Sequence, residues 1–218
     1  MHITQILAAG MSDTLKTDSS KWSIWFADER CVPPSSSDSN ERAVRDTMFA
    51  GKEPVLRDAA IEGIALRERD TVDASALAAD YATRLTKACA SADGGVPQLD
   101  LVLLGMGPDG HTASLFPGHA LLHESTVYVA PITDSPKPPS ERITLTLPTL
   151  KAARACWFVV TGAGKLDAIK SVASSLRAGS DDGTVATTLP SARLRPSEVL
   201  DLRWFLDAPA AGDETVSI

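Results

Sequence analysis

The stretch Leu101–Gly118, LVLLGMGPDGHTASLFPG, guides the interpretation of this sequence. It begins with a short, fully apolar run, and the strand expected over residues 99–104 lacks alternation, as expected of a parallel strand that is covered on both faces. The run leads into a glycine-containing loop that carries Asp109 and His111. In open α/β sheets, ligands bind at the carboxyl ends of the strands. The stretch therefore predicts a buried strand that delivers a titratable histidine to a ligand site.

Strand-like and helix-like patterns alternate on both sides of this stretch. Strands are expected at residues 22–27, 99–104, 126–132, 143–147, 156–161 and 203–206. Helices are expected at residues 3–15, 40–49, 74–90, 148–154 and 166–176, with Asp73 as the N-cap of the third. This order predicts an α/β fold with a mainly parallel, Rossmann-like sheet and helices on both faces. We expect one domain over residues 1–207 and a polar, frayed tail over residues 208–218.

Composition limits the classes of partner. The formal net charge of −7 disfavours nucleic acid and anionic membranes, which attract clustered lysine and arginine. Three widely spaced cysteines suggest neither a disulfide framework nor a zinc site, and instead suggest a reducing compartment. The sequence has no apolar run of transmembrane length and no targeting signal, so we expect a cytoplasmic protein. We also expect it to act as a monomer.

The central loop allows several interpretations. Residues 105–110 match GxGxxG, but the following strand does not end on the acidic residue that should meet a ribose, which disfavours a dinucleotide site. His111 is either a structural histidine or a general base that Asp109 holds in the working tautomer. His119 and His123 form no convincing metal set with Asp109, and we expect no metal. Cys31 has no evident base partner and is interpreted as a small buried residue.

Two further segments carry candidate charges. Asp28-Glu29-Arg30 follows the first expected strand, either as a solvated turn or as a cluster in which Arg30 offers a planar guanidinium to an anion. A later strand ends at Gly162-Ala163-Gly164-Lys165, directly before a helix. Free N–H groups at a helix start attract anions, and a lysine adds a full charge. This second segment is therefore a candidate phosphate site.

Four segments resemble the 6-phosphogluconolactonases in order and approximate spacing. They are DERCVP at residues 28–33, GMGPDGHTASLFPG at 105–118, PSERIT at 139–144 and VVTGAGK at 159–165. The related glucosamine-6-phosphate deaminases share the Asp-Gly-His, but in them a stretch with Asn-Glu-Pro typically follows, where this chain has TASLFP. Family members usually begin with a strand and a Gly-Gly-Ser-type turn. Here residues 3–15 are similar to the helix after that turn, so we expect the strand and the turn to be absent.

The resemblance implies hydrolysis of 6-phospho-D-glucono-1,5-lactone to 6-phosphogluconate in the pentose phosphate pathway, without a cofactor. His111 would be the general base and Asp109 its orienting carboxylate. Arg30, Arg142 and Lys165 match positions that hold the phosphate or lie beside the substrate. Gly107 and Gly110 belong to the loop whose N–H groups are candidates for stabilising the developing oxyanion.

Two other functions stay open at this point. The first is a sugar-phosphate deaminase or isomerase of the same fold, because the Asp-Gly-His is shared. The second is a non-catalytic sugar-phosphate binding module, because the amino-terminal phosphate turn is expected to be absent.

Overall fold

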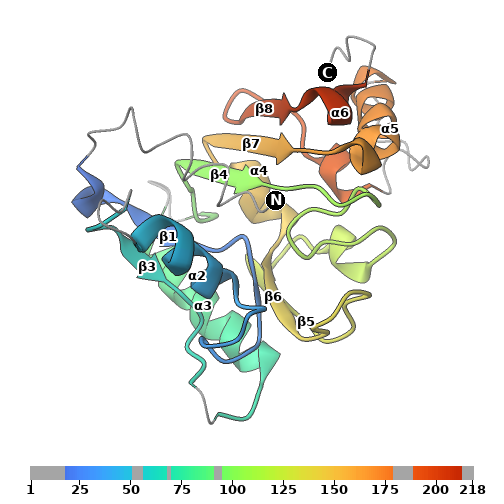
Figure 1. The fold of residues 1–218 in the computed structure, drawn as a ribbon. Helices are drawn as coiled ribbons and strands as arrows, with labels where there is room; N and C mark the ends of the chain where they lie inside the picture. Colours follow the sequence, from blue (N-terminus) through green and yellow to red (C-terminus); the bar gives the residue numbers. More distant parts are fainter. Residues whose placement is uncertain (1–17, 51–55, 68–69, 91–94, 179–188, 213–218) are drawn as a thin grey trace.

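The computed structural model describes residues 18–50, 56–67, 70–90, 95–178 and 189–212 (Figure 1). Three short sheets and the helices that cover them make up this part of the chain. The helix expected over residues 3–15, and with it the question of a preceding strand and turn, lies outside the described residues. The α/β class is confirmed.

One sheet is parallel and contains the strand of the central stretch. It consists of β4 (Leu101–Leu104), β7 (Ala155–Val160) and β8 (Asp201–Leu206), in the order β4-β7-β8. Leu101 lies opposite Ala155, which lies opposite Asp201. Because parallel neighbours end at the same edge of a sheet, the loops that follow β4 and β7 leave the sheet close together. This register brings residues 105–111 and 162–165 to one edge.

The other two sheets differ in direction. β1 (Ser23–Trp25) pairs in parallel with β3 (Ala60–Glu62), a strand that the sequence pattern does not predict. β2 (Asp28–Arg30), β6 (Arg142–Leu145) and β5 (Val129–Ile132) form an antiparallel sheet in the order β2-β6-β5. The prediction of a mainly parallel sheet is thus correct for two of the three sheets. The sequence pattern gives no sign of the antiparallel direction of β6. All four of its residues are buried, and a strand covered on both faces lacks the apolar/polar alternation that is typical of many antiparallel strands.

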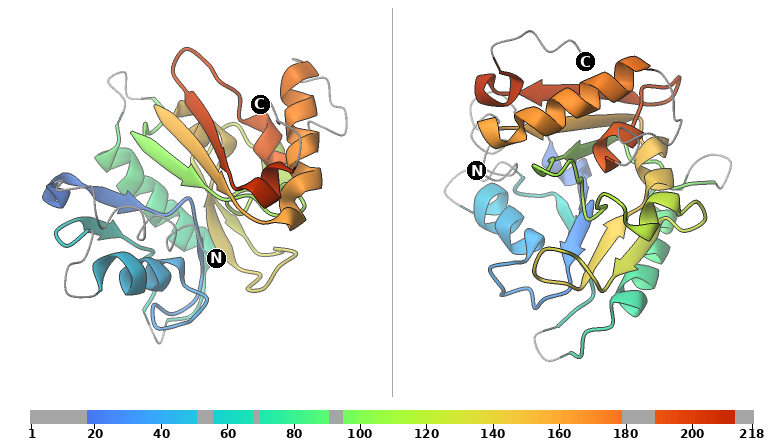
Figure 2. Two further views of the ribbon diagram at one scale, coloured as in Figure 1. Left: turned by 45° about the horizontal axis from the view of Figure 1, so that its top comes forward. Right: turned by 90° about the vertical axis from the view of Figure 1, so that its right-hand side faces the viewer.

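The two long helices form where the apolar spacing predicts them. α3 (Ala74–Ala88) begins after Asp73, whose side chain accepts a hydrogen bond from the backbone N–H of Ala76 at 3.0 Å. This bond satisfies one of the free N–H groups at the helix start. α5 (Leu166–Ala178) lies along the sheet that contains β8 (Figure 2). Its residues Ile169 and Val172 are fully buried.

Short helical segments complete the described chain. These are α2 (Asn40–Val44), its π-helical continuation (Arg45–Phe49), α4 (Leu147–Ala152), α6 (Ala208–Ala211) and the 3-10 turns Ser19–Lys21, Ala120–His123, Ala163–Lys165 and Pro190–Arg193. The prediction of a frayed tail from residue 208 is wrong for residues 208–212. The Asp207 carboxylate accepts hydrogen bonds from the N–H groups of Ala210 and Gly162, and Ala210 is buried. Residues 213–218 lie outside the described part.

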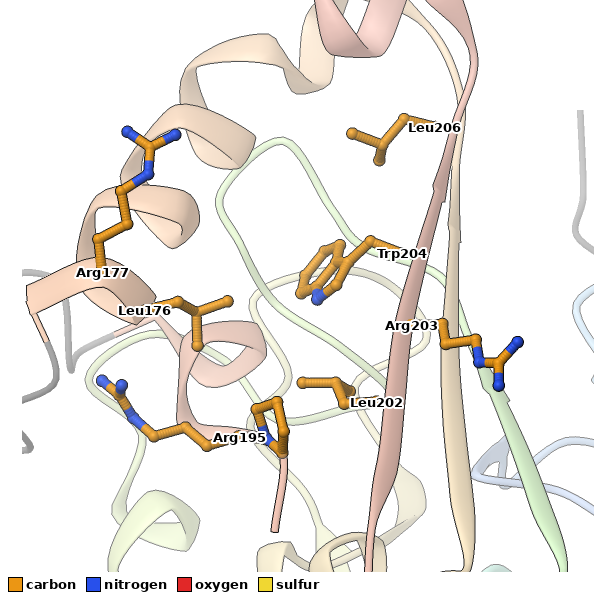
Figure 3. Close-up of a pocket in the computed structure, with 8 residues that line it drawn as sticks. Leu176, Arg177, Arg195, Leu202, Arg203, Trp204 and Leu206 are labelled. Atoms are coloured by element: carbon orange, nitrogen blue, oxygen red, sulfur yellow. The ribbon is translucent and has the colours of Figure 1, made fainter. Parts of the chain in front are cut away.

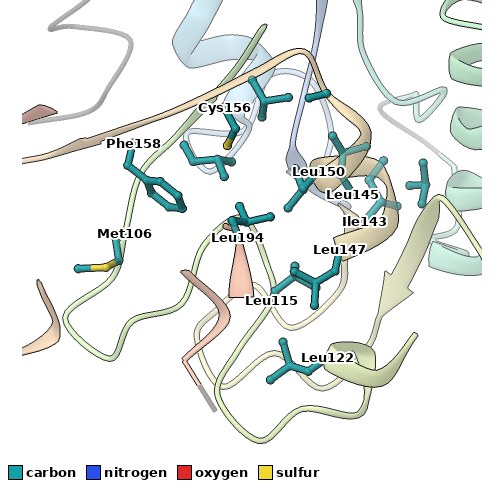
Figure 4. Close-up of a cluster of buried hydrophobic side chains, with 14 of the residues drawn as sticks. Met106, Leu115, Leu122, Ile143, Leu145, Leu147, Leu150, Cys156, Phe158 and Leu194 are labelled. Carbon is teal, nitrogen blue, oxygen red and sulfur yellow. The ribbon is translucent and has the colours of Figure 1, made fainter. Parts of the chain in front are cut away.

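The main core contains side chains of the parallel sheet, of β5 and β6 in the antiparallel sheet, and of helices α3, α4 and α5. Phe158, Leu115, Leu150 and Ile169 are among its fully buried side chains. Met106 and Leu115 belong to this cluster (Figure 4), and they flank residues 107–114, which we call the histidine loop. The loop is therefore attached to the core at both of its ends.

Candidate active site

Gly107 has no side chain and so leaves room for the His111 ring. The Gly107 N–H donates to the His111 carbonyl at 2.9 Å, and the Gly110 N–H donates to the Gly107 carbonyl at 3.0 Å. A Cβ on Gly107 would lie 2.0 Å from Nδ1 of His111, so only glycine admits the ring there. Gly110 has a φ of +77°, which favours glycine. Both amides are used inside the turn, so the role that the geometry supports for these glycines is steric rather than oxyanion binding.

The residues after His111 form a second tight turn. Thr112 and Leu115 exchange backbone hydrogen bonds, and the Thr112 hydroxyl donates to the Gly105 carbonyl at 2.9 Å. Ala113 has a φ of +48°, a left-handed conformation that non-glycine residues rarely adopt. Strain of this kind is typical of functional loops held by their surroundings.

Asp109, His111 and Lys137 form what we call the histidine cluster. Oδ1 of Asp109 lies 2.5 Å from Nδ1 of His111. Nζ of Lys137 lies 3.1 Å from Oδ2 of Asp109 and 3.0 Å from Nδ1 of His111. The imidazole also packs on Phe116, with ring centroids 5.0 Å apart. The Asp109 carboxylate thus orients the ring through Nδ1 and leaves Nε2 available to a ligand.

The electrostatics of the histidine cluster favour a neutral imidazole beside an ionised carboxylate. Burial lowers the pKa of His111, Asp109 acts to raise it and Lys137 lowers it again. For Asp109, partial burial acts to raise the pKa, but the hydrogen bonds and charges of His111 and Lys137 prevail and bring it to about 2. A neutral imidazole whose free nitrogen faces a ligand is the form needed for a general base.

Asp28, Ser114 and Arg142 form what we call the arginine cluster. Ser114 donates to Oδ2 of Asp28 at 2.7 Å, and Nη1 of Arg142 donates to the Ser114 hydroxyl at 3.3 Å and lies 3.8 Å from the same carboxylate. The other Arg142 nitrogens donate to the carbonyls of residues 137, 138 and 139. Only 4% of the Arg142 side chain is exposed. The resemblance implied that Arg142 holds the phosphate or lies beside the substrate; its nitrogens are engaged within the protein, which favours a place beside the substrate.

Arg30 differs from Arg142, which lies opposite it in the antiparallel register. Like charges directly opposite each other on a sheet are destabilising, so such a pair needs a reason. Nη1 of Arg30 donates to the Asp38 carbonyl at 2.7 Å, whereas its Nε is buried and, within the described chain, has no hydrogen-bond partner. An anion would satisfy this nitrogen.

Neighbouring Glu29 fixes the strand that carries Arg30. The Glu29 carboxylate accepts hydrogen bonds from the backbone N–H groups of Arg30, Asn40 and Glu41, and the residue is 1% exposed. Burial raises the pKa of Glu29 to about 7, against the effect of these donors. The expected triplet of charges is therefore a strand with one buried member, not a solvated turn.

Lys165 ends the turn that follows β7, at the same sheet edge as the histidine loop. Partial burial and the like charge of Lys137 lower its pKa, whereas Asp109 raises it. Lys165 therefore acts electrostatically on the histidine cluster, as expected from its place after a parallel neighbour of β4. Asp28 also acts electrostatically on His111, so the charged strand β2 and the turn after β7 both influence the histidine cluster.

Lys137 is the site residue that sequence reasoning missed. It lies in the proline-rich loop between β5 and β6, which the pattern marks only as too stiff for a helix. The available signal was a single cation in this stiff loop, five residues before Arg142. No periodicity indicates that the loop folds back over residues 109–111.

A separate pocket of about 670 Å³ lies between α5 and β8. Leu176, Leu202 and Trp204 line it together with arginine side chains (Figure 3). None of the sequence-predicted site residues is among those that line it. Cys31 is buried, as predicted, and burial raises the pKa of its thiol to about 12.

Within the described ranges, no three His, Cys, Asp or Glu side chains are grouped so as to hold a metal ion. The helices described here also include none with the length and apolar character needed to cross a membrane.

Comparison with known proteins places this chain in one family. Residues 2–204 match the family model described as glucosamine-6-phosphate isomerases/6-phosphogluconolactonase. A probable 6-phosphogluconolactonase of Schizosaccharomyces pombe is 39% identical over 97% of this chain and 79% of its own length. A probable chloroplastic 6-phosphogluconolactonase of Oryza sativa subsp. indica is 41% identical over 88% of this chain, which spans 56% of that longer relative.

The fold comparison agrees. The crystal structure of a 6-phosphogluconolactonase from Shewanella baltica is similar with a TM-score of 0.67 and 28% sequence identity. The similarity covers 92% of this chain and 77% of that one.

Proposed function

The chain belongs to the glucosamine-6-phosphate isomerase/6-phosphogluconolactonase family, and from this premise we propose that it hydrolyses 6-phospho-D-glucono-1,5-lactone to 6-phosphogluconate. The observation that carries the proposal is His111, oriented through Nδ1 by Asp109 at a sheet edge where cationic side chains gather. The TASLFP sequence after the histidine supports the lactonase rather than the deaminase branch.

In the proposed reaction, Nε2 of His111 takes a proton from a water molecule as the water oxygen bonds to the lactone carbonyl carbon. The carbonyl electrons move to oxygen, which gives a tetrahedral intermediate. When that intermediate collapses, the bond between the carbonyl carbon and the ring oxygen breaks. The ring oxygen then takes the proton from the imidazolium, which restores the neutral base. Positioned proton transfer of this kind contributes about 10²–10⁴-fold to rate.

The chain as a whole is acidic, so a phosphate site needs cations that are gathered locally. These cations must also have donors that contacts within the fold do not already use. We assign Arg30 and Lys165 to this role. The buried Nε of Arg30 is without a partner in the described chain, and Lys165 stands at a turn before a helix start. Arg142 would act on the site by holding neighbouring backbone in place rather than by touching the phosphate.

The test is a coupled assay on the purified chain. Glucose 6-phosphate and its dehydrogenase generate the lactone, and the appearance of 6-phosphogluconate is followed by its own dehydrogenase. We expect catalysed opening well above the spontaneous rate. No acceleration at any enzyme concentration would rule out the proposal, and ammonia release from glucosamine 6-phosphate would instead support the deaminase. Binding of 6-phosphogluconate without turnover would identify a binding module.

We also propose that the protein acts as a monomer in the cytosol. The described cysteines, Cys31, Cys89 and Cys156, are all free thiols, as suits a reducing compartment. Size-exclusion chromatography and cell fractionation test the two parts of this proposal.

A further inference from the structure

The ammonium of Lys137 contacts both members of the proposed catalytic pair. Its Nζ lies 3.1 Å from Oδ2 and 3.3 Å from Oδ1 of Asp109, and 3.0 Å from Nδ1 of His111. Lys137 comes from the loop before β6, whereas Asp109 and His111 come from the loop after β4. Two segments that are distant in sequence therefore meet at one titratable ring.

The backbone of Lys137 is held on two sides. Nη2 of buried Arg142 donates to the carbonyls of Lys137 at 2.8 Å and Pro138 at 3.1 Å, and Nε donates to the carbonyl of Pro139 at 2.9 Å. The Ser135 hydroxyl also donates to the Lys137 carbonyl, at 2.8 Å. The Lys137 side chain extends from this anchored backbone and is 41% exposed. Its ammonium contacts the other two members of the histidine cluster. These contacts with the loop backbone thus determine where the Lys137 ammonium lies.

We propose that Lys137 is a positioning residue that keeps His111 in its base form. The proposal rests on the proposed function and names a residue that acts on the substrate only through the histidine. The ammonium binds both oxygens of the Asp109 carboxylate, and Oδ1 also accepts the shorter hydrogen bond from Nδ1 of His111. This arrangement fixes the tautomer with its lone pair on Nε2. The positive charge beside the ring also opposes a second proton there.

The charges that face His111 come from several elements. Asp109 in its own loop and Asp28 on β2 favour the protonated ring, whereas Lys137 disfavours it. Lys165, from the turn after β7, acts on both Asp109 and Lys137. Lys137 is thus the cation that offsets two carboxylates at the ring. In the catalytic cycle, it favours return of the proton from the imidazolium to the departing ring oxygen.

Histidine NMR tests the proposal without relying on turnover. The sequence has four histidines, so His111→Ala assigns the His111 signal by its loss. We expect Lys137→Met to raise the pKa of His111 by about one pH unit, because a like charge within hydrogen-bond distance is removed. Lys137→Arg keeps the charge and is expected to keep the low pKa. Lys151→Met, at an exposed position on α4, is the matched control and is expected to change nothing.

Kinetics distinguish this role from phosphate binding. The acidic limb of kcat/KM is expected to move to higher pH in Lys137→Met, in step with the NMR titration, while KM for the lactone stays within about twofold. An unmoved His111 pKa in folded Lys137→Met would overturn the proposal. So would a selective rise in KM for the phosphorylated lactone with an unmoved limb. If Lys137→Met does not fold, Lys137→Gln serves for the same titration. Absence of lactonase activity in the wild type would refute the proposed function alone, because the NMR titration reports the lysine–histidine contact independently.

Discussion

The histidine cluster and the arginine cluster lie close together but use their charges differently. In the arginine cluster, the guanidinium of Arg142 is buried and donates to the Ser114 hydroxyl and to three carbonyls. In the histidine cluster, Asp109 and Lys137 are about 40% exposed and His111 has a ring nitrogen without a protein partner in the contacts described above. A charge with all its donors satisfied fixes backbone, whereas a charge with unused capacity can meet a ligand. This difference separates the supporting residue from the reactive one.

The largest effect is expected on catalysis, when the reactive residue His111 is replaced. We expect His111→Ala to lower kcat for the phosphorylated lactone about 10³-fold, because proton transfer from water is lost. The melting temperature is expected to change little, since the Asp109 and Lys137 side chains that the ring contacts are about 40% exposed. Steady-state rates and thermal unfolding measure the two quantities, and wild-type turnover in this variant would assign the chemistry elsewhere.

Removal of the buried Arg142 guanidinium should affect stability more than catalysis, which is the reverse of the pattern expected for His111→Ala. Arg142→Met is expected to lower the free energy of unfolding by about 3 kcal/mol, because Asp28 and the loop carbonyls lose their buried partner. Arg154→Met removes an exposed ion pair with Asp100 and is expected to cost at most about 1 kcal/mol. Chemical denaturation of both variants makes the comparison. Equal and small losses would mean that Arg142 is not a structural anchor.

Substitutions at Arg30 and Lys165 sharpen the contrast between the two arginines. We expect Arg30→Ala and Lys165→Ala each to raise KM for the phosphorylated lactone about 10–100-fold, since a charge-assisted hydrogen bond is worth about 1.5–3 kcal/mol. Unphosphorylated gluconolactone lacks the anion and is the control substrate. If KM rises equally for both substrates, these cations do not meet the phosphate.

The smallest effect is expected at the strained turn that supports the histidine cluster. Ala113→Gly relieves a left-handed conformation worth about 1 kcal/mol but adds backbone entropy to the unfolded chain, so the net change in stability should be below about 0.5 kcal/mol. Ala113→Val should be destabilising by more than about 1 kcal/mol, because a branched side chain fits this conformation poorly. Similar melting temperatures for the two variants would contradict the assigned strain.

The sequence predicts most of the elements that carry the site. Asp73 and the apolar stripe of α3 act locally, and the apolar run of β4 together with the glycines after it marks the loop that bears Asp109 and His111. These signals depend on neighbours within a few residues, which is why they are legible in one sequence. The place of Lys165 also follows, because parallel strands end at one edge.

Other features depend on long-range packing and leave no local signal. The contact of Lys137 with Asp109 arises because Arg142 holds a loop 28 residues away in sequence. The antiparallel direction of β6 and the burial of Arg142 are likewise set by pairing with β2. A basic residue in a sequence does not reveal whether its partners are carbonyls of the same fold or a ligand.

The central claim is that neutral His111 acts as the base, and the most direct test compares two titrations of the wild-type chain. One is the pH dependence of kcat/KM for the phosphorylated lactone, and the other is the NMR titration of the His111 ring. Because burial and Lys137 lower the pKa of His111, we expect activity to rise with pH through a value below the usual histidine range of about 6.5. The account predicts that the kinetic limb coincides with the ring titration. A limb that lies more than one pH unit from the His111 titration would contradict it.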